Sequence, residues 1–282
     1  MKRERGIFMA YLVSRSLIIS DLDGTLLQKD KSISKDNLKA LRDWTECGGD
    51  FTIATGRSII SASHRISNLP ITCPAVVFNG GVLYDYRSRQ LQLKQELISE
   101  YREIVAVMLD RYPKIGVEIM TEDIIYLPAR NDIVERHMAR ESLKHTDCPV
   151  GKLPASGVIK VLFGVPTDQV DQFLEEMKKR LPPCFYPVRT DENYCEMMLT
   201  GVDKGKGLET LKYLNQSDWD CVIAFGDFFN DLPLFETATI AMATANAPQQ
   251  VKCQADYVVS SNDESALFYG IELLLGQGIL KK

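Results

Sequence analysis

Short apolar runs separated by amphipathic stretches set the pattern of the first eighty residues. Three such runs cover residues 17–19, 51–54 and 74–78. Apolar runs of this length that end at turn-forming residues predict buried strands. Between the first two runs, Ser34 is placed to cap a helix that ends near Gly48. Strands that alternate with helices in this way predict a parallel α/β sheet.

Polar side chains follow each predicted strand. Asp21 and Asp23 follow the first, Thr55 the second and Asn79 the third. Ligands of parallel α/β sheets bind beyond the carboxyl ends of the strands, so these residues are candidates for a site. Two carboxylates one residue apart repel each other, and a cation or a bound proton has to compensate them. Mg2+ does so while it keeps positions open for phosphate oxygens.

The middle of the chain follows a different pattern. Between residues 84 and 199, helical stretches accompany strands that are spaced as hairpins, which predicts an inserted α+β domain. The first pattern then resumes, with Lys204 at the start of a helix and a further apolar strand at residues 221–225. We therefore expect a core made of residues 1–83 and 200–282, interrupted by the insertion.

Composition narrows the class of protein. Hydrophobic residues make up 45% of the 282 positions and the formal net charge is −5, which argues against a nucleic-acid footprint. No stretch approaches the roughly 18 apolar residues of a membrane helix. Seven scattered cysteines without a Cys-x-x-Cys pair favour a reducing cytoplasm over a zinc site or a disulfide framework. Charges interrupt the apolar patch near the start, so we expect no signal peptide, and Met9 is a candidate alternative start.

Four clusters occur in a fixed order along the chain. They are DLDGT at 21–25, TGR at 55–57, DKGKG at 203–207 and GDFFND at 226–231. Together they resemble the haloacid dehalogenase superfamily, and within it the Cof-type (subfamily IIB) phosphatases. FNGG at 78–81 and IAMATANAPQQV at 240–251 are similar as well. The resemblance covers nearly the whole chain and implies a Rossmann-like parallel-sheet core with an inserted α+β cap, or lid, domain.

The resemblance implies chemical roles for four aspartates. Asp21 is expected to be the nucleophile that takes the phosphoryl group as an aspartyl phosphate, and Asp23 the general acid and base. Mg2+ is expected to bind the Asp21 carboxylate, the backbone carbonyl of Asp23 and Asp227. Asp231 would support the metal from outside or through a water molecule.

A second set of residues is expected to hold the phosphoryl group. Phosphoryl transfer spreads negative charge over the equatorial oxygens, which donors and cations stabilise. Lys204 would serve here and would also hold the Asp21 carboxylate in position. The other expected contacts are Thr55, the backbone amides of Leu22 and Gly56, Asn230 and, as a further candidate, Arg57.

Several residues also have plain structural interpretations. Thr55 could belong to an ordinary turn, Lys204 could be solvated, and Asn230 could cap a helix. The histidines at 64, 137 and 145 are expected at the surface of helical stretches. Phe228 and Phe229, and the stretch MATANAP at 242–248, depart from the usual family pattern and affect substrate range more than chemistry.

The leading hypothesis is a cytoplasmic, Mg2+-dependent phosphatase of small phosphomonoesters, with sugar phosphates foremost. Its partner would be a small phosphorylated metabolite, with no nucleic acid, membrane or obligate protein partner. A phosphomutase, whose lid retains and turns a bisphosphate, is an alternative. A non-catalytic sensor of a phosphorylated metabolite is another, although a pure binder has no need of a nucleophile.

Overall fold

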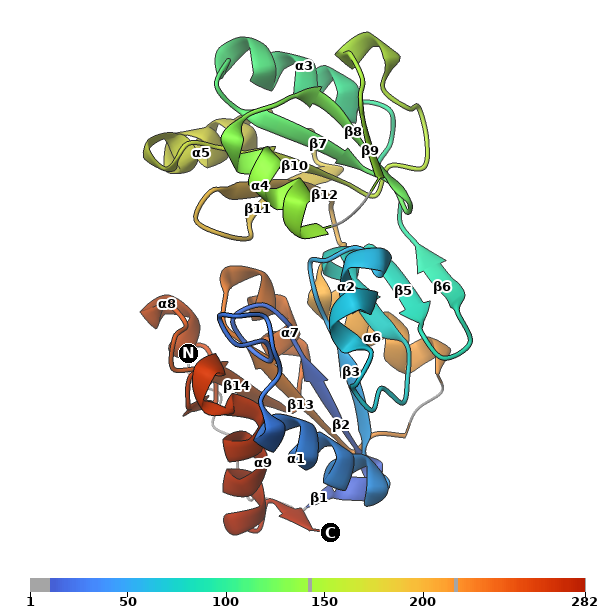
Figure 1. The fold of residues 1–282 in the computed structure, drawn as a ribbon, viewed down its shortest axis with the longest axis vertical. Helices are drawn as coiled ribbons and strands as arrows, with labels where there is room; N and C mark the ends of the chain where they lie inside the picture. The colour runs from blue at the N-terminus through green and yellow to red at the C-terminus, as the bar shows by residue number, and fades with distance from the viewer. Residues whose placement is uncertain (1–10, 142–143, 216–217, 282) are drawn as a thin grey trace. The chain divides into compact units, whose positions relative to one another are not determined.

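The computed structural model describes residues 11–141, 144–215 and 218–281, and the candidate start at Met9 lies outside them. The chain forms two compact units (Figure 1). The first contains the described residues up to Thr55, Arg65–Gln92 and those from Asp203 onward, and the second contains Gly56–His64 and Leu93–Val202. None of the described helices combines the length and apolarity needed to cross a bilayer.

The first unit is built on a five-stranded sheet in which every neighbouring pair is parallel. In spatial order its strands are β15 (Tyr257–Val259), β14 (Ile240–Thr244), β13 (Cys221–Gly226), β2 (Ser16–Ser20) and β3 (Asp50–Ile53). All residues of β2 and β13 are buried, as expected for parallel strands covered on both faces. The α/β fold class predicted from the apolar runs is confirmed.

Helices and two small sheets complete the first unit. Ser34 caps α1 as predicted, because its side chain accepts a hydrogen bond from the backbone nitrogen of Asn37. Helix α1 packs against α9, and α6 packs against α7. The helices are α1 (Lys35–Glu46), α2 (Ile59–Ile66, shared with the second unit), α6 (Lys204–Leu214), α7 (Leu232–Thr237), α8 (Gln249–Lys252) and α9 (Ala266–Gly276). The small sheets are β1 (Tyr11–Leu12) with β16 (Leu280–Lys281), and β4 (Ala75–Val77), β5 (Val82–Asp85) and β6 (Gln90–Lys94).

Among its described residues, the second unit has a six-stranded sheet, three helices of its own and most of the shared helix α2. Its neighbouring strands are antiparallel except for the parallel pair of β8 and β9. In spatial order they are β11 (Phe185–Arg189), β12 (Tyr194–Leu199), β10 (Lys160–Gly164), β7 (Gly116–Met120), β8 (Ile124–Ala129) and β9 (Lys144–Asp147). The helices are α3 (Tyr101–Arg111), α4 (Asp132–Glu141) and α5 (Val170–Arg180). The hairpin of β7 and β8 and the α+β character agree with the sequence pattern.

Two clusters of apolar side chains pack the helices of the second unit against its six-stranded sheet. Phe163 of β10 packs with Phe173 of α5 in the larger cluster, and Val134 of α4 packs with Leu162 and Tyr194 in the smaller one. Residues that alternate along a strand point to opposite faces, so neighbours such as Leu162 and Phe163 serve different clusters. The sheet is therefore covered by helices on both faces.

The expectation for the histidines is partly wrong. His137 is buried, and its Nδ1 lies 2.8 Å from Oε2 of the fully buried Glu118 on β7. His145 is exposed but lies in strand β9 and not on a helix, whereas His64 is exposed on α2 as expected. Sequence spacing alone could not show that α4 covers the sheet at Glu118.

Short 3-10 turns connect these elements. They are η1 (Val13–Arg15), η2 (Phe78–Gly80), η3 (Val150–Lys152), η4 (Thr167–Gln169), η5 (Phe229–Asp231) and η6 (Asn262–Glu264). Two of them, η2 and η5, follow strand ends of the first unit and carry Asn79 and Asn230.

Candidate active site

The carboxyl ends of three neighbouring strands bring the predicted residues together. Asp21 directly follows β2, Asp227 directly follows β13, and Thr55 lies two residues beyond β3. The backbone nitrogen of Asp21 donates to the carbonyl of Phe225, which ties the first two strand ends together. Because these strands are parallel, their carboxyl ends meet at one edge of the sheet.

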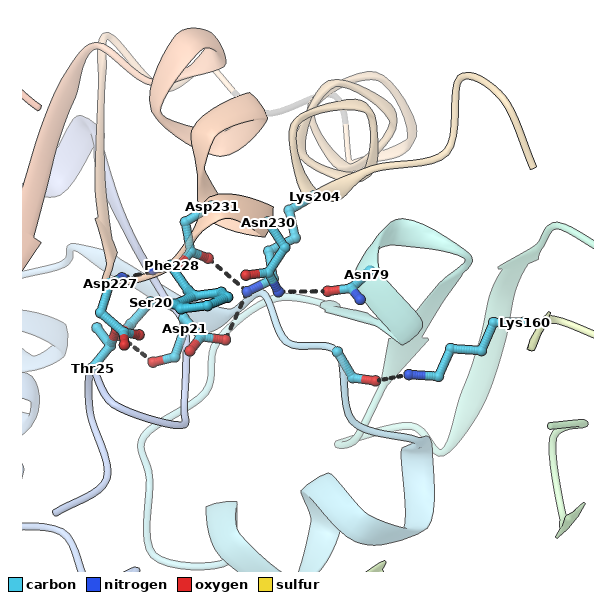
Figure 2. Close-up of polar contacts among 11 residues, drawn as sticks. Ser20, Asp21, Thr25, Asn79, Lys160, Lys204, Asp227, Phe228, Asn230 and Asp231 are labelled. Atoms are coloured by element: carbon cyan, nitrogen blue, oxygen red, sulfur yellow. Dashed lines mark hydrogen bonds and ion pairs between the residues drawn. The ribbon is translucent and has the colours of Figure 1, made fainter. Parts of the chain in front are cut away.

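Lys204 lies at the centre of this edge (Figure 2). Its side chain is fully buried, and its Nζ lies 2.7 Å from Oδ1 of Asp21 and 2.6 Å from Oδ1 of Asp231. Burial by itself would lower the pKa of Lys204, but the charges of the two carboxylates outweigh it and raise the pKa above its usual value. Lys204 is therefore a fixed positive charge and not a solvated surface lysine.

The carboxyls of the buried Asp21 and the partly buried Asp227 have raised pKa values. Burial raises the pKa of Asp21 to about 7, opposed by Lys204 and reinforced by the charges of Asp231 and Asp23. Burial also raises the pKa of Asp227 well above its usual range, with added repulsion from Asp21 and Asp231. These shifts mark a surplus of negative charge at this edge of the sheet.

Three of the carboxyls could hold a metal ion. Asp21, Asp227 and Asp231 each offer an oxygen, and these oxygens lie within 4.8 Å of one another. An all-oxygen set suits a hard cation such as Mg2+, and Lys204 supplies one positive charge against three carboxylates. The predicted metal group fits the residues present, because a divalent cation would compensate the carboxylate charge that Lys204 leaves unbalanced.

Gly24 makes the close approach of Asp227 possible. It has a φ of +79°, and a Cβ at this position would lie 2.3 Å from Oδ2 of Asp227. The other carboxylate oxygen of Asp227, Oδ1, accepts a hydrogen bond of 2.8 Å from the Thr25 hydroxyl. The amide of Asn246 donates to the Gly24 carbonyl at 2.8 Å, so the unusual stretch after β14 supports this turn. Thr25 and Asn246 were not among the predicted site residues, although they lie in the family-like stretches at 21–25 and 240–251.

Asp231 holds the loop after β13 in place. Its Oδ1 contacts Lys204, and its Oδ2 accepts from the backbone nitrogens of Asp227 at 2.9 Å and Phe228 at 3.0 Å. A Cβ on Gly226 would lie 2.6 Å from Asp231, so the loop requires glycine there. Both oxygens of Asp231 are thus engaged with the protein, which suits an orienting role beside a metal more than direct ligation.

Asp23 is not one of the three carboxyls whose oxygens lie within 4.8 Å of one another. Its side chain is 38% exposed, and its Oδ1 pairs with the Nζ of Lys31 at 2.8 Å. Two residues apart on a strand, Asp21 and Asp23 would point the same way, but β2 ends at Ser20. Lys31 was not identified from sequence, because no motif or spacing connects it to Asp23.

Three predicted phosphate-contacting residues of the first unit differ in their burial and their contacts. Leu22 is fully buried, and Thr55 is buried with its carbonyl accepting from the backbone nitrogen of Asn79. Asn230 donates its side-chain amide to Oδ1 of Asn79 at 3.0 Å. These contacts join two predicted phosphate-contacting residues to Asn79, which was predicted at a strand end near the site but without a contact to the phosphoryl group.

Gly56 and Arg57 belong to the second unit. Arg57 is buried and donates to the hydroxyl of Ser61 at 2.6 Å. The Nζ of Lys160 (Figure 2) donates to the Gly56 carbonyl at 2.8 Å. The same Nζ pairs with the buried Glu196 at 2.7 Å. Sequence reasoning left Lys160 and Glu196 without a role, since neither lies in a motif that it recognised.

The chain is similar in sequence and in fold to known phosphatases and hydrolases. A family model described as haloacid dehalogenase-like hydrolase matches residues 18–271. The 5-amino-6-(5-phospho-D-ribitylamino)uracil phosphatase YwtE of Bacillus subtilis is 27% identical, over 92% of this chain and 97% of its own length. The pyridoxal phosphate phosphatase YbhA of Escherichia coli is 26% identical, over 89% of this chain and 95% of its own. The crystal structure of SMU.1108c from Streptococcus mutans UA159 has the same fold, with a TM-score of 0.82 at 21% identity over 92% of this chain and 98% of that one.

Proposed function

This chain belongs to the haloacid dehalogenase-like hydrolase family, and on that premise we propose that it is a Cof-type phosphatase of small phosphomonoesters. The observation that carries the proposal is the buried Lys204 between Asp21 and Asp231, with Asp227 in the same acidic group. A fully buried ion pair of this kind costs desolvation energy, so its place at the ligand-binding edge of the sheet favours a chemical role over a purely structural one.

Asp21 is the proposed nucleophile. Lys204 holds its Oδ1, which orients the carboxylate and leaves its other oxygen for attack on phosphorus. Attack forms a bond between that oxygen and phosphorus and breaks the bond to the leaving alcohol oxygen. Water then attacks the resulting aspartyl phosphate, releases inorganic phosphate and regenerates the Asp21 carboxylate.

Asp23 is the proposed general acid and base. It protonates the leaving oxygen in the first step and takes a proton from water in the second. In this structure the Asp23 Oδ1 pairs with the Nζ of Lys31 at 2.8 Å. Contact of this oxygen with the leaving group therefore requires Asp23 to release Lys31.

The proposed Mg2+ site consists of the carboxylates of Asp21 and Asp227 and the backbone carbonyl of Asp23. When bound, the ion would neutralise negative charge on the phosphoryl oxygens and on these carboxylates. Asp231 keeps the Asp227 backbone in position through the hydrogen bond to its nitrogen. Thr55, Asn230 and the amides of Leu22 and Gly56 are the proposed donors to the phosphoryl oxygens.

We further propose that the insertion predicted at residues 84–199 is a cap domain that supplies substrate contacts. Sugar phosphates and related metabolites are the proposed substrates. Two relatives named above act, by their names, on a phosphoribitylamino-uracil and on pyridoxal phosphate, which are both small phosphomonoesters. Seven free cysteines fit the proposed cytoplasmic location.

The decisive experiment measures phosphate release from p-nitrophenyl phosphate with Mg2+, for the wild-type protein and for Asp21→Asn. We expect the variant to lose more than about a thousandfold in rate, as enzymes do when a covalent nucleophile is removed. Asp168→Asn, an exposed aspartate of the second unit, is the matched control and should keep full activity. Equal rates for wild type and Asp21→Asn would contradict the proposal.

A panel of phosphorylated metabolites, ranked by kcat/KM, then identifies the substrate class. Accumulation of a bisphosphate and dependence on a bisphosphate activator would identify a phosphomutase instead. Tight binding of a sugar phosphate without turnover would identify a sensor.

A further inference from the structure

The loop after β4 has an unusual backbone. Phe78, Asn79 and Gly80 follow one another with φ values of 52°, 53° and 98°. Residues other than glycine rarely adopt this left-handed region, and for a bulky side chain such as Phe78 the conformation is strained. Both Phe78 and Asn79 are buried. Such a conformation persists only where surrounding contacts hold it, so the contacts of this loop indicate what it is for.

The loop contacts three segments that carry proposed site residues. The Asn79 backbone nitrogen donates to the carbonyl of Thr55 at 2.9 Å. The Asn79 Oδ1 accepts from the Nδ2 of Asn230 at 3.0 Å (Figure 2). Gly80 packs so closely that a Cβ there would lie 2.1 Å from the carbonyl oxygen of Asp203, the residue before Lys204. All of these residues belong to the first unit.

The side-chain bond between Asn79 and Asn230 determines how the Asn230 amide is oriented. A primary amide has two N–H donors, and Asn79 accepts one of them. The direction of the second donor and of the carbonyl oxygen is then set, since the amide group is planar. The connection between β4 and β5 accounts for the left-handed backbone at residue 79. It does not account for the Asn79 side-chain amide, which a connecting loop does not need.

We propose that Asn79 is a positioning residue for the phosphoryl group of the substrate. It orients the Asn230 amide through its side chain and the Thr55 segment through its backbone nitrogen. The left-handed backbone of Phe78 and Asn79 brings one residue within reach of both. This inference rests on the function proposed above, and it gives a role to Asn79, which lies in the FNGG stretch at 78–81.

A double-mutant cycle tests the proposal. Asn79→Gly keeps a residue suited to the left-handed backbone and removes only the side chain. We expect Asn79→Gly and Asn230→Ala each to lower kcat/KM by about ten- to hundredfold, as the loss of an orienting contact does at comparable sites. The double variant should be no worse than the weaker single variant, because Asn79 acts through Asn230. Asn68→Gly, at an exposed asparagine of the same unit, should leave kcat/KM unchanged.

Inhibition by inorganic phosphate gives a second readout, because its Ki should rise in parallel with the loss in kcat/KM. Effects of the two substitutions that multiply, or an unchanged kcat/KM in Asn79→Gly, would overturn the proposal. A loss of thermal stability alone does not produce the expected coupling with Asn230→Ala. If the wild-type protein hydrolysed no substrate, that result would refute the proposed phosphatase function but not the proposed role of Asn79. The same cycle read by calorimetric binding of inorganic phosphate would then decide the role of Asn79.

Discussion

Binding of Mg2+ should weaken as the pH falls, because the ion and protons compete for the same carboxyls. A carboxyl must be ionised to ligate the metal. Burial raises the pKa of Asp21 to about 7, and it raises the pKa of Asp227 well above its usual range. In the metal-free protein, protons therefore occupy part of this site near neutral pH, and the bound ion has to displace them.

The size of the effect follows from the pKa of Asp21. With a pKa of about 7, about one tenth of this carboxyl is ionised at about pH 6 and about nine tenths at about pH 8. The apparent dissociation constant for Mg2+ should therefore be about tenfold larger at the lower pH, and the raised pKa of Asp227 adds to this difference.

The same shifts predict how the metal-free protein responds to pH. A carboxyl whose pKa is higher in the folded state than in the unfolded state binds more protons when folded. Folding stability then falls as the pH rises from about 4 to about 7, while these buried carboxyls are forced to ionise. Mg2+ should raise the melting temperature most at the upper end of this range, where the uncompensated charge is greatest.

Titration calorimetry in two buffers of different ionisation enthalpy measures both the affinity and the protons released. We expect release of at least about one proton per ion at about pH 6 and less at about pH 8. Asp21→Asn should lose most of this pH dependence, and the exposed Asp168→Asn should retain it. Affinities that agree within about twofold at the two pH values, without proton release, would refute the competition between protons and metal.

Two substitutions test the packing of the acidic group. Lys204→Met leaves two carboxylates buried without their cation, and should lower the free energy of unfolding by about 3–5 kcal/mol in urea titrations without Mg2+. The exposed Lys206→Met should lower it by less than about 1 kcal/mol, and similar losses for both would contradict a buried, uncompensated charge. Gly24→Ala places a Cβ 2.3 Å from Oδ2 of Asp227 and should weaken Mg2+ binding at least about tenfold in calorimetry. Gly157→Ala has a similar φ of +80° with no neighbour within 4 Å, so an equal loss of Mg2+ affinity there would show that backbone strain, and not the clash, is responsible.

Much of the core fold could be predicted from local pattern. The strands β2, β3 and β13 are buried on both faces, and such strands have to be continuously apolar, which makes them visible in the sequence. Ser34 was recognisable as a helix cap because its side chain has a local partner three residues away. The motif order then placed Asp21 and Asp227 at neighbouring strand ends, where the structure has them.

Contacts between distant segments were not predictable in the same way. The alternation of side chains gave no direction for Asp23, because β2 ends at Ser20 and the Asp23 carboxylate pairs with Lys31 in a loop. No pattern in the sequence indicated the hydrogen bond between Asn79 and Asn230, which lies 151 positions later. Periodicity describes which face a residue takes within one element, and it carries no information about which other element covers that face.

The sequence by itself determined the parallel α/β core, the strand ends that carry aspartates and the chain's membership of its family. Only the tertiary structure decided that Lys204, 183 positions after Asp21, is fully buried between two carboxylates. It also decided that Asp23 pairs with Lys31 and that Asn79 links Thr55 to Asn230. The physical reason is that charge, burial and hydrogen bonding act over a few ångströms in space, whichever parts of the chain the fold brings there.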